Sequence, residues 1–175
     1  MKIPTQILLI SWVLPVSLGH LPALAQFEDS SEAPIEITAD SMEWLNDEKI
    51  AIARGNADAV QGNYTLSAHV LTAHMADTSP EDSNAPSRIR RIDAEGNVVL
   101  TTPKETARGG TGTYDLEKKM AVLVGSVVLT QGDNVLHGQK LVMDLTTGRS
   151  RLEGTSSESD GRVRAIFSPS QDSQQ

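Results

Sequence analysis

The sequence predicts an all-β protein built from stacked repeats, and three observations support that prediction. Apolar and polar residues alternate with a period of two, as at Val98 and Leu100 and again at Val127 and Leu129. Polar turn signals interrupt this alternation roughly every 8–15 residues. Three ungapped segments, 37–55, 107–125 and 136–154, align with one another, and a fourth starts at Leu66.

Residues 1–25 differ from the rest of the chain, and we expect them to be a secretory signal peptide. Lys2 gives the start a positive charge, an apolar run covers 7–14, and Ala23-Leu24-Ala25 is the small-residue pattern that signal peptidase prefers. The run is shorter than the roughly 20 residues of a transmembrane helix. An uncleaved membrane anchor is the alternative. Cleavage after Ala25 implies export, and an exported chain without cysteine suits the bacterial periplasm.

The repeat units begin at Ile37, Leu66, Ala107 and Leu136, in steps of 29, 41 and 29 residues. The long step contains an inserted loop at 77–87. Each unit is predicted to hold two long strands with a bend, and the units to stack into one elongated pair of sheets, a sandwich or roll. The apolar set changes face at a bend, and small residues favour bulges and corners. Such residues recur early in each unit, at Ala39, Ala68, Gly109 and Gly138.

The domain boundaries follow from this repeat. Residues 26–33 are expected to be a flexible N-terminus, 34–167 one β-domain, and 168–175 a disordered tail. A stack of strands has an open edge at each end. Such an edge is either capped or used for strand addition to a partner.

Composition excludes several classes of protein. The chain has 175 residues, with 15 Lys and Arg against 23 Asp and Glu, a net charge of −8. That length excludes a large multidomain enzyme, and the acid excess argues against nucleic acid as a partner. With no cysteine there is neither a disulfide framework nor a thiolate zinc site.

The sequence contains no catalytic motif, so we expect no catalytic residue, metal site or cofactor. His69 and His74 are five residues apart and would point to opposite faces of a strand, which makes them a poor metal pair. In the repeat alignment His69 shares a polar, outward column with Asp40, Gly110 and Gln139. A carboxylate pair like that of a polysaccharide-acting β-solenoid enzyme stays open as an alternative.

The segment 34–40, together with the glycine-containing stretches 95–100 and 125–132, resembles the OstA-like (LptA) family over about residues 34–154. The resemblance implies a twisted, boat-shaped β-jellyroll, open at both ends, in a periplasmic protein of Gram-negative bacteria that conveys lipopolysaccharide from the inner to the outer membrane. It implies an LptC-like inner-membrane partner, an LptD-like outer-membrane partner, and head-to-tail self-association by edge strands. A membrane-anchored, LptC-like component of the same pathway is the alternative.

The implied cargo is the acyl chains of lipid A, which require an apolar groove, because each methylene exposed to water costs about 0.8 kcal/mol. The basic cluster Arg88, Arg90 and Arg91 is a candidate contact for an anionic headgroup, and the equivalent Trp44 and Tyr114 are candidates to set the groove's width. The groove candidates are the inward apolar positions Ile35, Ile37, Trp44, Leu66, Val98, Leu100, Tyr114, Leu116, Val127, Leu129, Leu136, Leu141 and Met143.

Overall fold

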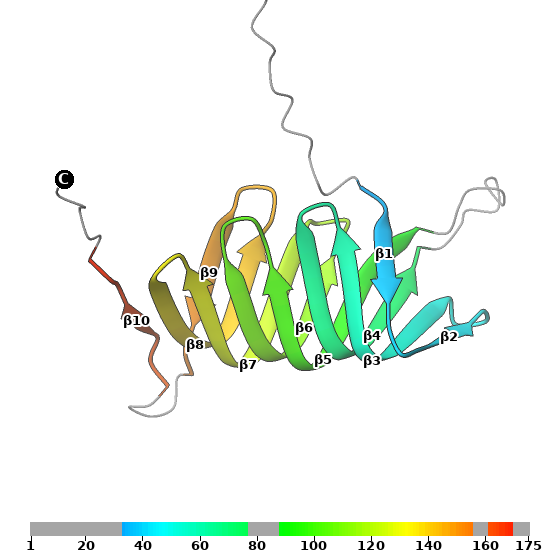
Figure 1. The fold of residues 1–175 in the computed structure, drawn as a ribbon, viewed down its shortest axis with the longest axis horizontal. Helices are drawn as coiled ribbons and strands as arrows, with labels where there is room; N and C mark the ends of the chain where they lie inside the picture. The colour runs from blue at the N-terminus through cyan, green and yellow to red at the C-terminus, as the bar shows by residue number, and fades with distance from the viewer. Residues whose placement is uncertain (1–32, 77–87, 156–160, 170–175) are drawn as a thin grey trace, which may run out of the picture.

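The computed structural model describes residues 33–76, 88–155 and 161–169, and these form one antiparallel sheet of ten strands (Figure 1). Every regular element in these ranges is a strand, and no helix there could cross a membrane. The all-β prediction is confirmed. The strands are β1 (Ile35–Thr38), β2 (Ser41–Leu45), β3 (Ile50–Gln61), β4 (Tyr64–Met75), β5 (Ile89–Thr101), β6 (Thr106–Asp115), β7 (Met120–Gln131), β8 (Asn134–Asp144), β9 (Arg149–Glu153) and β10 (Arg164–Ile166).

From β3 to β8 each strand pairs with the next strand in sequence, so the sheet is a meander. At the ends, β1 and β2 pair with the two halves of β3, and β9 and β10 pair with the two halves of β8. The expected pair of sheets is therefore a single sheet, bent lengthwise. A jellyroll built from stacked repeats is not confirmed.

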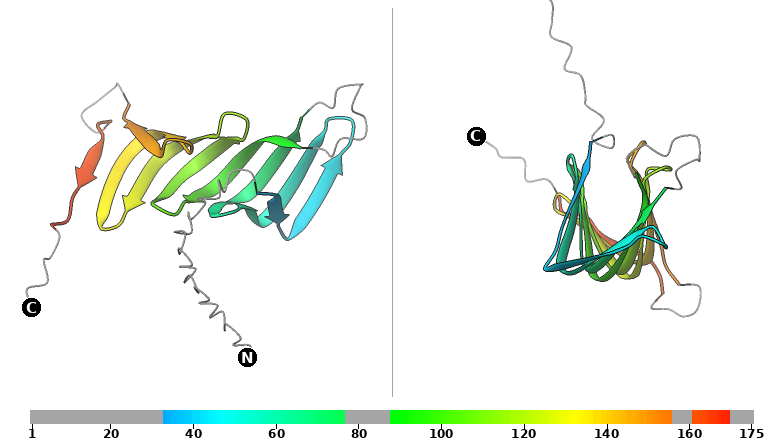
Figure 2. Two further views of the ribbon diagram at one scale, coloured as in Figure 1. Left: turned by 90° about the horizontal axis from the view of Figure 1, so that it is seen from above. Right: turned by 90° about the vertical axis from the view of Figure 1, so that its right-hand side faces the viewer.

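The bend turns the sheet into a trough, which the end-on view in Figure 2 shows as an open V. Each pairing from β3 to β8 shifts register near mid-strand, as between Arg54 and Ala57, so every long strand crosses from one wall of the trough to the other. Wall 1 comprises β2, 50–54, 70–75, 89–95, 111–115, 120–124, 140–144 and β9. Wall 2 comprises β1, 57–61, 64–68, 98–101, 106–109, 127–131, 134–138 and β10.

The corners between the walls depend on pairs of residues with left-handed backbone. Gly96 has φ +79° and Asn97 +51°, and the pairs 55–56 and 125–126 repeat this conformation. Glycine adopts it without strain and asparagine tolerates it, whereas most side chains clash with the backbone there. Gly55, Gly96 and Gly125, which close three of the aligned segments, are thus mid-strand corner residues, whereas Gly154 follows the end of β9. On the neighbouring strands the register shifts fall at 68–69 and 109–110, where the sequence analysis expects bends.

Polar side chains from adjacent strands cover these corners. Asn56 Nδ2 donates to Asp40 Oδ2 at 3.0 Å, and Asn97 Nδ2 lies 3.1 Å from His69 Nε2. Ser126 N donates to Gln139 Oε1 at 3.3 Å. Asp40, His69 and Gln139, three members of this polar column, therefore pair with backbone and amide groups at the bend.

Several sequence-based expectations fall outside the described residues. These are the signal peptide at 1–25, most of the N-terminal segment 26–33, the loop 77–87 and residues 170–175. The described chain continues to residue 169, and Ser168 Oγ donates to the carbonyl oxygen of Asp133 at 3.1 Å.

Candidate functional site

The inner face of the trough is apolar along its whole length. Its buried residues form one cluster that runs from Ala51 in β3 to Met143 in β8. Every second residue of a strand points to the same face of the sheet, and paired residues in neighbouring strands share a face. The alternating apolar residues of successive strands therefore form one apolar surface. One such row joins Ala59, Leu66 and Leu100 across β3, β4 and β5.

The predicted groove residues all lie on this inner face, with different degrees of burial. Eight are buried, namely Leu66, Val98, Leu100, Tyr114, Val127, Leu129, Leu141 and Met143. Four are half-buried and pack against the cluster, namely Ile35, Ile37, Leu116 and Leu136. Trp44 is 49% exposed, but it pairs with Ala51 and so faces inward.

The walls pack against each other in the middle of the trough. Leu71, Ile92, Leu123 and Leu141 are among the fully buried side chains. The cavity between the walls, lined by Ile35, Leu100 and Tyr114 among others, has a volume of only about 10 Å³. That is about the space of one water molecule, so an acyl chain does not fit into this cavity as the walls stand.

One hydrogen bond between side chains crosses the mouth of the trough where the walls meet. Tyr114 near the end of β6 is on wall 1, and Gln61 at the end of β3 is on wall 2. The Tyr114 hydroxyl donates to Gln61 Oε1 at 2.9 Å, and Gln61 Nε2 donates to the carbonyl oxygen of Ala33 at 3.0 Å. Both side chains are buried, Tyr114 being 4% and Gln61 7% exposed.

A second cross-wall hydrogen bond lies further along the mouth. Ser150 in β9 belongs to wall 1, and its hydroxyl donates to Oε1 of Glu105, which precedes β6 on wall 2, at 2.6 Å. Beside it is a mouth cavity of about 160 Å³, lined by Lys104, Thr146, Thr147 and other rim residues above an apolar floor that includes Met143 and Leu145.

The two cross-wall bonds have the same stagger. Each joins wall 2 at one strand to wall 1 three strands further along the chain, β3 to β6 and β6 to β9. The ends of the trough are therefore slanted. At the N-terminal end wall 1 extends beyond wall 2, and at the C-terminal end wall 2 extends beyond wall 1.

Burial at the ends follows from this slant. Where an end strand faces the opposite wall its inner residues are half-buried, as at Ile37 in β1 and Leu152 in β9. Where nothing faces it, the inner residues are exposed. In β2 these exposed residues are Met42 and Trp44. Beside β10 they are Val163 and Phe167, which lie two positions before and after the inward-facing Ala165; Phe167 is 70% exposed. Both ends thus present uncovered apolar side chains.

Gln61 is not among the predicted groove residues, because Gln61-Gly62-Asn63 has the sequence pattern of a turn. A signal was present: Gln61 continues the inward alternation of Ala57 and Ala59. What the sequence did not contain was its partner, because Tyr114 is 53 positions away and contacts it across the mouth, not along a strand ladder.

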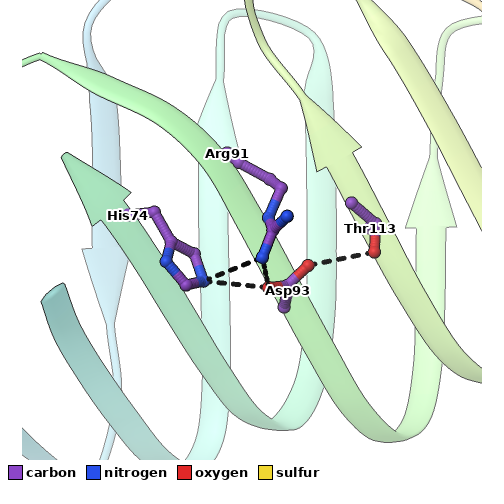
Figure 3. A network of polar contacts seen from close by, with 4 residues as sticks. All are labelled: His74, Arg91, Asp93 and Thr113. Carbon is purple, nitrogen blue, oxygen red and sulfur yellow. Dashed lines mark hydrogen bonds and ion pairs between the residues drawn. The ribbon is translucent and has the colours of Figure 1, made fainter. Parts of the chain in front are cut away.

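The three arginines of the predicted headgroup contact do not lie together at the mouth of the trough. Arg91 lies on the outer face, where its NH2 group donates to Asp93 Oδ2 at 2.7 Å (Figure 3). His74 Nε2 lies 2.9 Å from the same oxygen, and Thr113 Oγ1 donates to Asp93 Oδ1 at 3.0 Å. This network joins three adjacent strands and takes the Arg91 charge away from the mouth. Arg88 and Arg90 are exposed at the rim of wall 1.

Carboxylates organise two of the rim turns. Hydrogen bonding to the Lys118 side chain, 2.8 Å from Asp115, is the main cause that lowers the pKa of Asp115. Backbone N–H groups of Thr147 and Thr146 donate to Asp144 Oδ1 at 3.1 and 2.9 Å, and the bond from Thr147 is the main cause that lowers the pKa of Asp144. Both carboxylates are structural. In the described ranges no three His, Cys, Asp or Glu side chains lie close enough together to hold a metal ion.

A single antiparallel sheet bent into an apolar trough, with open and uncovered ends, defines the fold class of this chain. Residues 36–149 match the model of the LptA/(LptD N-terminal domain) LPS transport proteins. The chain belongs to this family. Family members are transport proteins and not enzymes, so the alternative of a polysaccharide-acting enzyme does not hold.

Individual relatives agree with the family. An uncharacterized protein of Rhizobium meliloti (strain 1021) is 32% identical over 141 residues, 80% of this chain and 74% of the relative. The lipopolysaccharide export system protein LptH of Pseudomonas aeruginosa is 27% identical over 138 residues, 75% of this chain and 74% of that protein. The crystal structure of LptH, described as the LptA-homologous periplasmic component of the lipopolysaccharide transport device, matches this fold with a TM-score of 0.68. That match has 20% identity and covers 80% of this chain and 99% of that one.

Proposed function

We propose that this protein is a periplasmic carrier that holds the acyl chains of lipid A in its trough and conveys lipopolysaccharide from the inner to the outer membrane. One observation carries the proposal: the apolar inner face is continuous and ends at both openings in uncovered apolar side chains. An ordinary β-domain would cover Trp44 and Phe167 or replace them with polar residues, because exposed apolar patches favour association.

The energetics favour a trough of this kind. An acyl chain of about a dozen carbons costs on the order of 10 kcal/mol when it is exposed to water, at about 0.8 kcal/mol per methylene. Apolar contacts such as those of Leu100 and Val127 can offset this cost if the walls separate and the chain takes the place of the opposite wall. Binding then exchanges wall-to-wall contacts for wall-to-lipid contacts, and it requires no catalytic group.

The open strand edges suit a bridge between the two membranes. The half-strands β1 and β2 form the free edge at one end, and β9 and β10 form the free edge at the other. In this proposal an LptC-like inner-membrane partner, an LptD-like outer-membrane partner and further copies of the chain add strands at these edges. Sequencing the N-terminus of protein purified from cells tests the location: a start at Gln26 supports a soluble periplasmic carrier, and a retained 1–25 supports the anchored alternative.

Photo-crosslinking in cells tests the cargo. A photoreactive amino acid at Leu100, Tyr114 or Leu129 is expected to capture lipopolysaccharide. The matched controls are the adjacent Val99, Thr113 and Val128, which point outward in the same strands. Equal capture from inward and outward positions, or capture from neither set, would contradict the proposal.

A further inference from the structure

The mouth cavity has the size of a sugar ring. It lies between two turns that meet across the mouth, 102–105 on wall 2 and 145–148 on wall 1. Its volume of about 160 Å³ is the space of roughly ten water molecules, which is comparable to one hexose. Unlike the small cavity between the walls, it is already open as the walls stand.

The mouth cavity adjoins that small, largely apolar cavity. Tyr64 and Leu145 line both of them. The mouth cavity is also lined by the polar side chains of Lys104, Glu105 and Gln131. A polar compartment that continues directly into an apolar one fits an amphiphile, with its head in the first and its hydrocarbon chain in the second.

Three side chains of the mouth cavity have atoms available for sugar hydroxyls. Glu105 Oε1 accepts from Ser150, which leaves Oε2 for a ligand. Within the described part of the chain, neither the Tyr64 hydroxyl nor the Gln131 amide has a hydrogen-bond partner. A carboxylate accepts, whereas an amide and a phenol both donate and accept. Together they match a ring whose hydroxyl groups need donors as well as acceptors.

Lys104 adds a positive charge to this cavity. A Cβ placed on Gly148 would lie 3.6 Å from Lys104 Nζ, so the ammonium of wall 2 reaches the opposite hairpin. It forms no ion pair with any carboxylate of the described ranges. Of the two nearby acids, Glu105 is bonded to Ser150, and Asp144 is bonded to backbone N–H groups of its own turn. The ammonium therefore favours a ring with an anionic substituent, because charge-assisted hydrogen bonds are stronger than neutral ones.

We propose that the mouth cavity binds one sugar ring at the head of an amphiphile and that Lys104 donates to a phosphate on that ring. This inference rests on the proposed function. Gln131, Tyr64 and Glu105 bind the ring hydroxyls, and the acyl chain passes beside Tyr64 and Leu145 into the trough when the walls separate there. The head can bind before the walls move, because its site is already open.

The test of the phosphate contact compares N-lauroylglucosamine 1-phosphate with N-lauroylglucosamine, which differ only in the phosphate. Their dissociation constants are measured by calorimetry below the critical micelle concentrations. The unaltered protein should prefer the phosphorylated ligand, and Lys104→Met should reduce this preference about fivefold, the effect of one hydrogen bond. Lys140→Met is the matched control, since it removes the same charge from the outer face of β8 and should leave the preference unchanged.

Gln131→Ala tests the sugar contact. It should weaken binding of both glucosamine ligands about threefold and leave binding of laurate, which has the same chain and no sugar, unchanged. Lys104 and Gln131 are exposed, so both variants are expected to fold. An unchanged phosphate preference in Lys104→Met, or an equal loss of laurate binding in Gln131→Ala, would overturn the inference alone.

Two ligands without a chain distinguish a headgroup site from a site for free anions. Inorganic phosphate and glucose 1-phosphate should bind far more weakly than N-lauroylglucosamine 1-phosphate, because they lack the hydrocarbon chain. If either binds as tightly as the acylated ligand, the cavity is a site for free anions and the inference is wrong. An unaltered protein that binds neither acylated glucosamine would contradict the proposed function as well.

Discussion

Leu100→Ala tests whether the walls of the trough are packed together in solution. Leu100 is 2% exposed and lines the small cavity beneath the Tyr114–Gln61 bond. Truncating a buried leucine to alanine costs about 2–5 kcal/mol, and more where the site cannot collapse. Strand β5 is hydrogen-bonded to β4 and β6 on its two sides, so little collapse is possible. We expect a loss of about 3–4 kcal/mol in the free energy of unfolding.

Urea denaturation measures this loss. With a slope of about 2 kcal/mol per M urea, the midpoint should fall by about 1.5–2 M without a change in slope. The control is Val60→Ala in β3, whose side chain is 38% exposed, and its cost should be below about 0.5 kcal/mol. If Leu100→Ala costs no more than Val60→Ala, the walls stand apart in solution and the closed trough described here is wrong.

Three further predictions follow from the ends, the corners and the rim. Trp44→Ser should change the free energy of unfolding by less than about 1 kcal/mol but weaken self-association in analytical ultracentrifugation; unchanged association would remove Trp44 from the interface. Gly96→Ala should lower the thermal midpoint of unfolding more than Gly132→Ala. Both glycines have positive φ, but only at Gly96 would the added Cβ lie 3.1 Å from a neighbouring side chain. Equal shifts of the midpoint would contradict the crowded corner. The lowered pKa values of Asp115 and Asp144 stabilise the fold above the ordinary carboxyl pKa of 3.8, and this contribution is lost as the pH falls through the lowered values. Replacing both with Asn should therefore reduce the free energy of unfolding at neutral pH by an amount that shrinks as the pH falls below 3.8. A deficit that stays constant in acid would point to another cause.

Local patterns predicted the fold because the relevant contacts are local. Alternation along β5 and β7 places Val98, Leu100, Val127 and Leu129 on the inner face, and strand pairing extends that face from neighbour to neighbour. Turn signals in the sequence also match the connections, since the polar stretch 117–119 joins β6 to β7. These features depend on residues that are close in sequence or paired in a hairpin.

Contacts between the walls were not predictable in the same way. The bond from Tyr114 to Gln61 depends on the tilt of the strands, which sets a stagger of three strands, and no period in the sequence encodes that tilt. The corner glycines end the aligned segments in the sequence, and a bend at them was not predictable for a related reason. A glycine that interrupts alternation has the same sequence signature at a turn and at a bend within a strand, and only its backbone angle, such as +79° at Gly96, distinguishes the two.

The slanted ends have a consequence for movement between neighbouring molecules. If both walls stopped at the same strand, a hydrocarbon chain that left the trough would lose its entire protein surroundings in one step. In the proposed transport, a hydrocarbon chain would leave one wall of the trough three strands before it leaves the other. A partner that continued the sheet would therefore overlap this protein along a slanted junction. At every point of such a crossing one side of the hydrocarbon chain would stay covered, and the free-energy barrier to transfer would be spread along the junction and not concentrated at a gap.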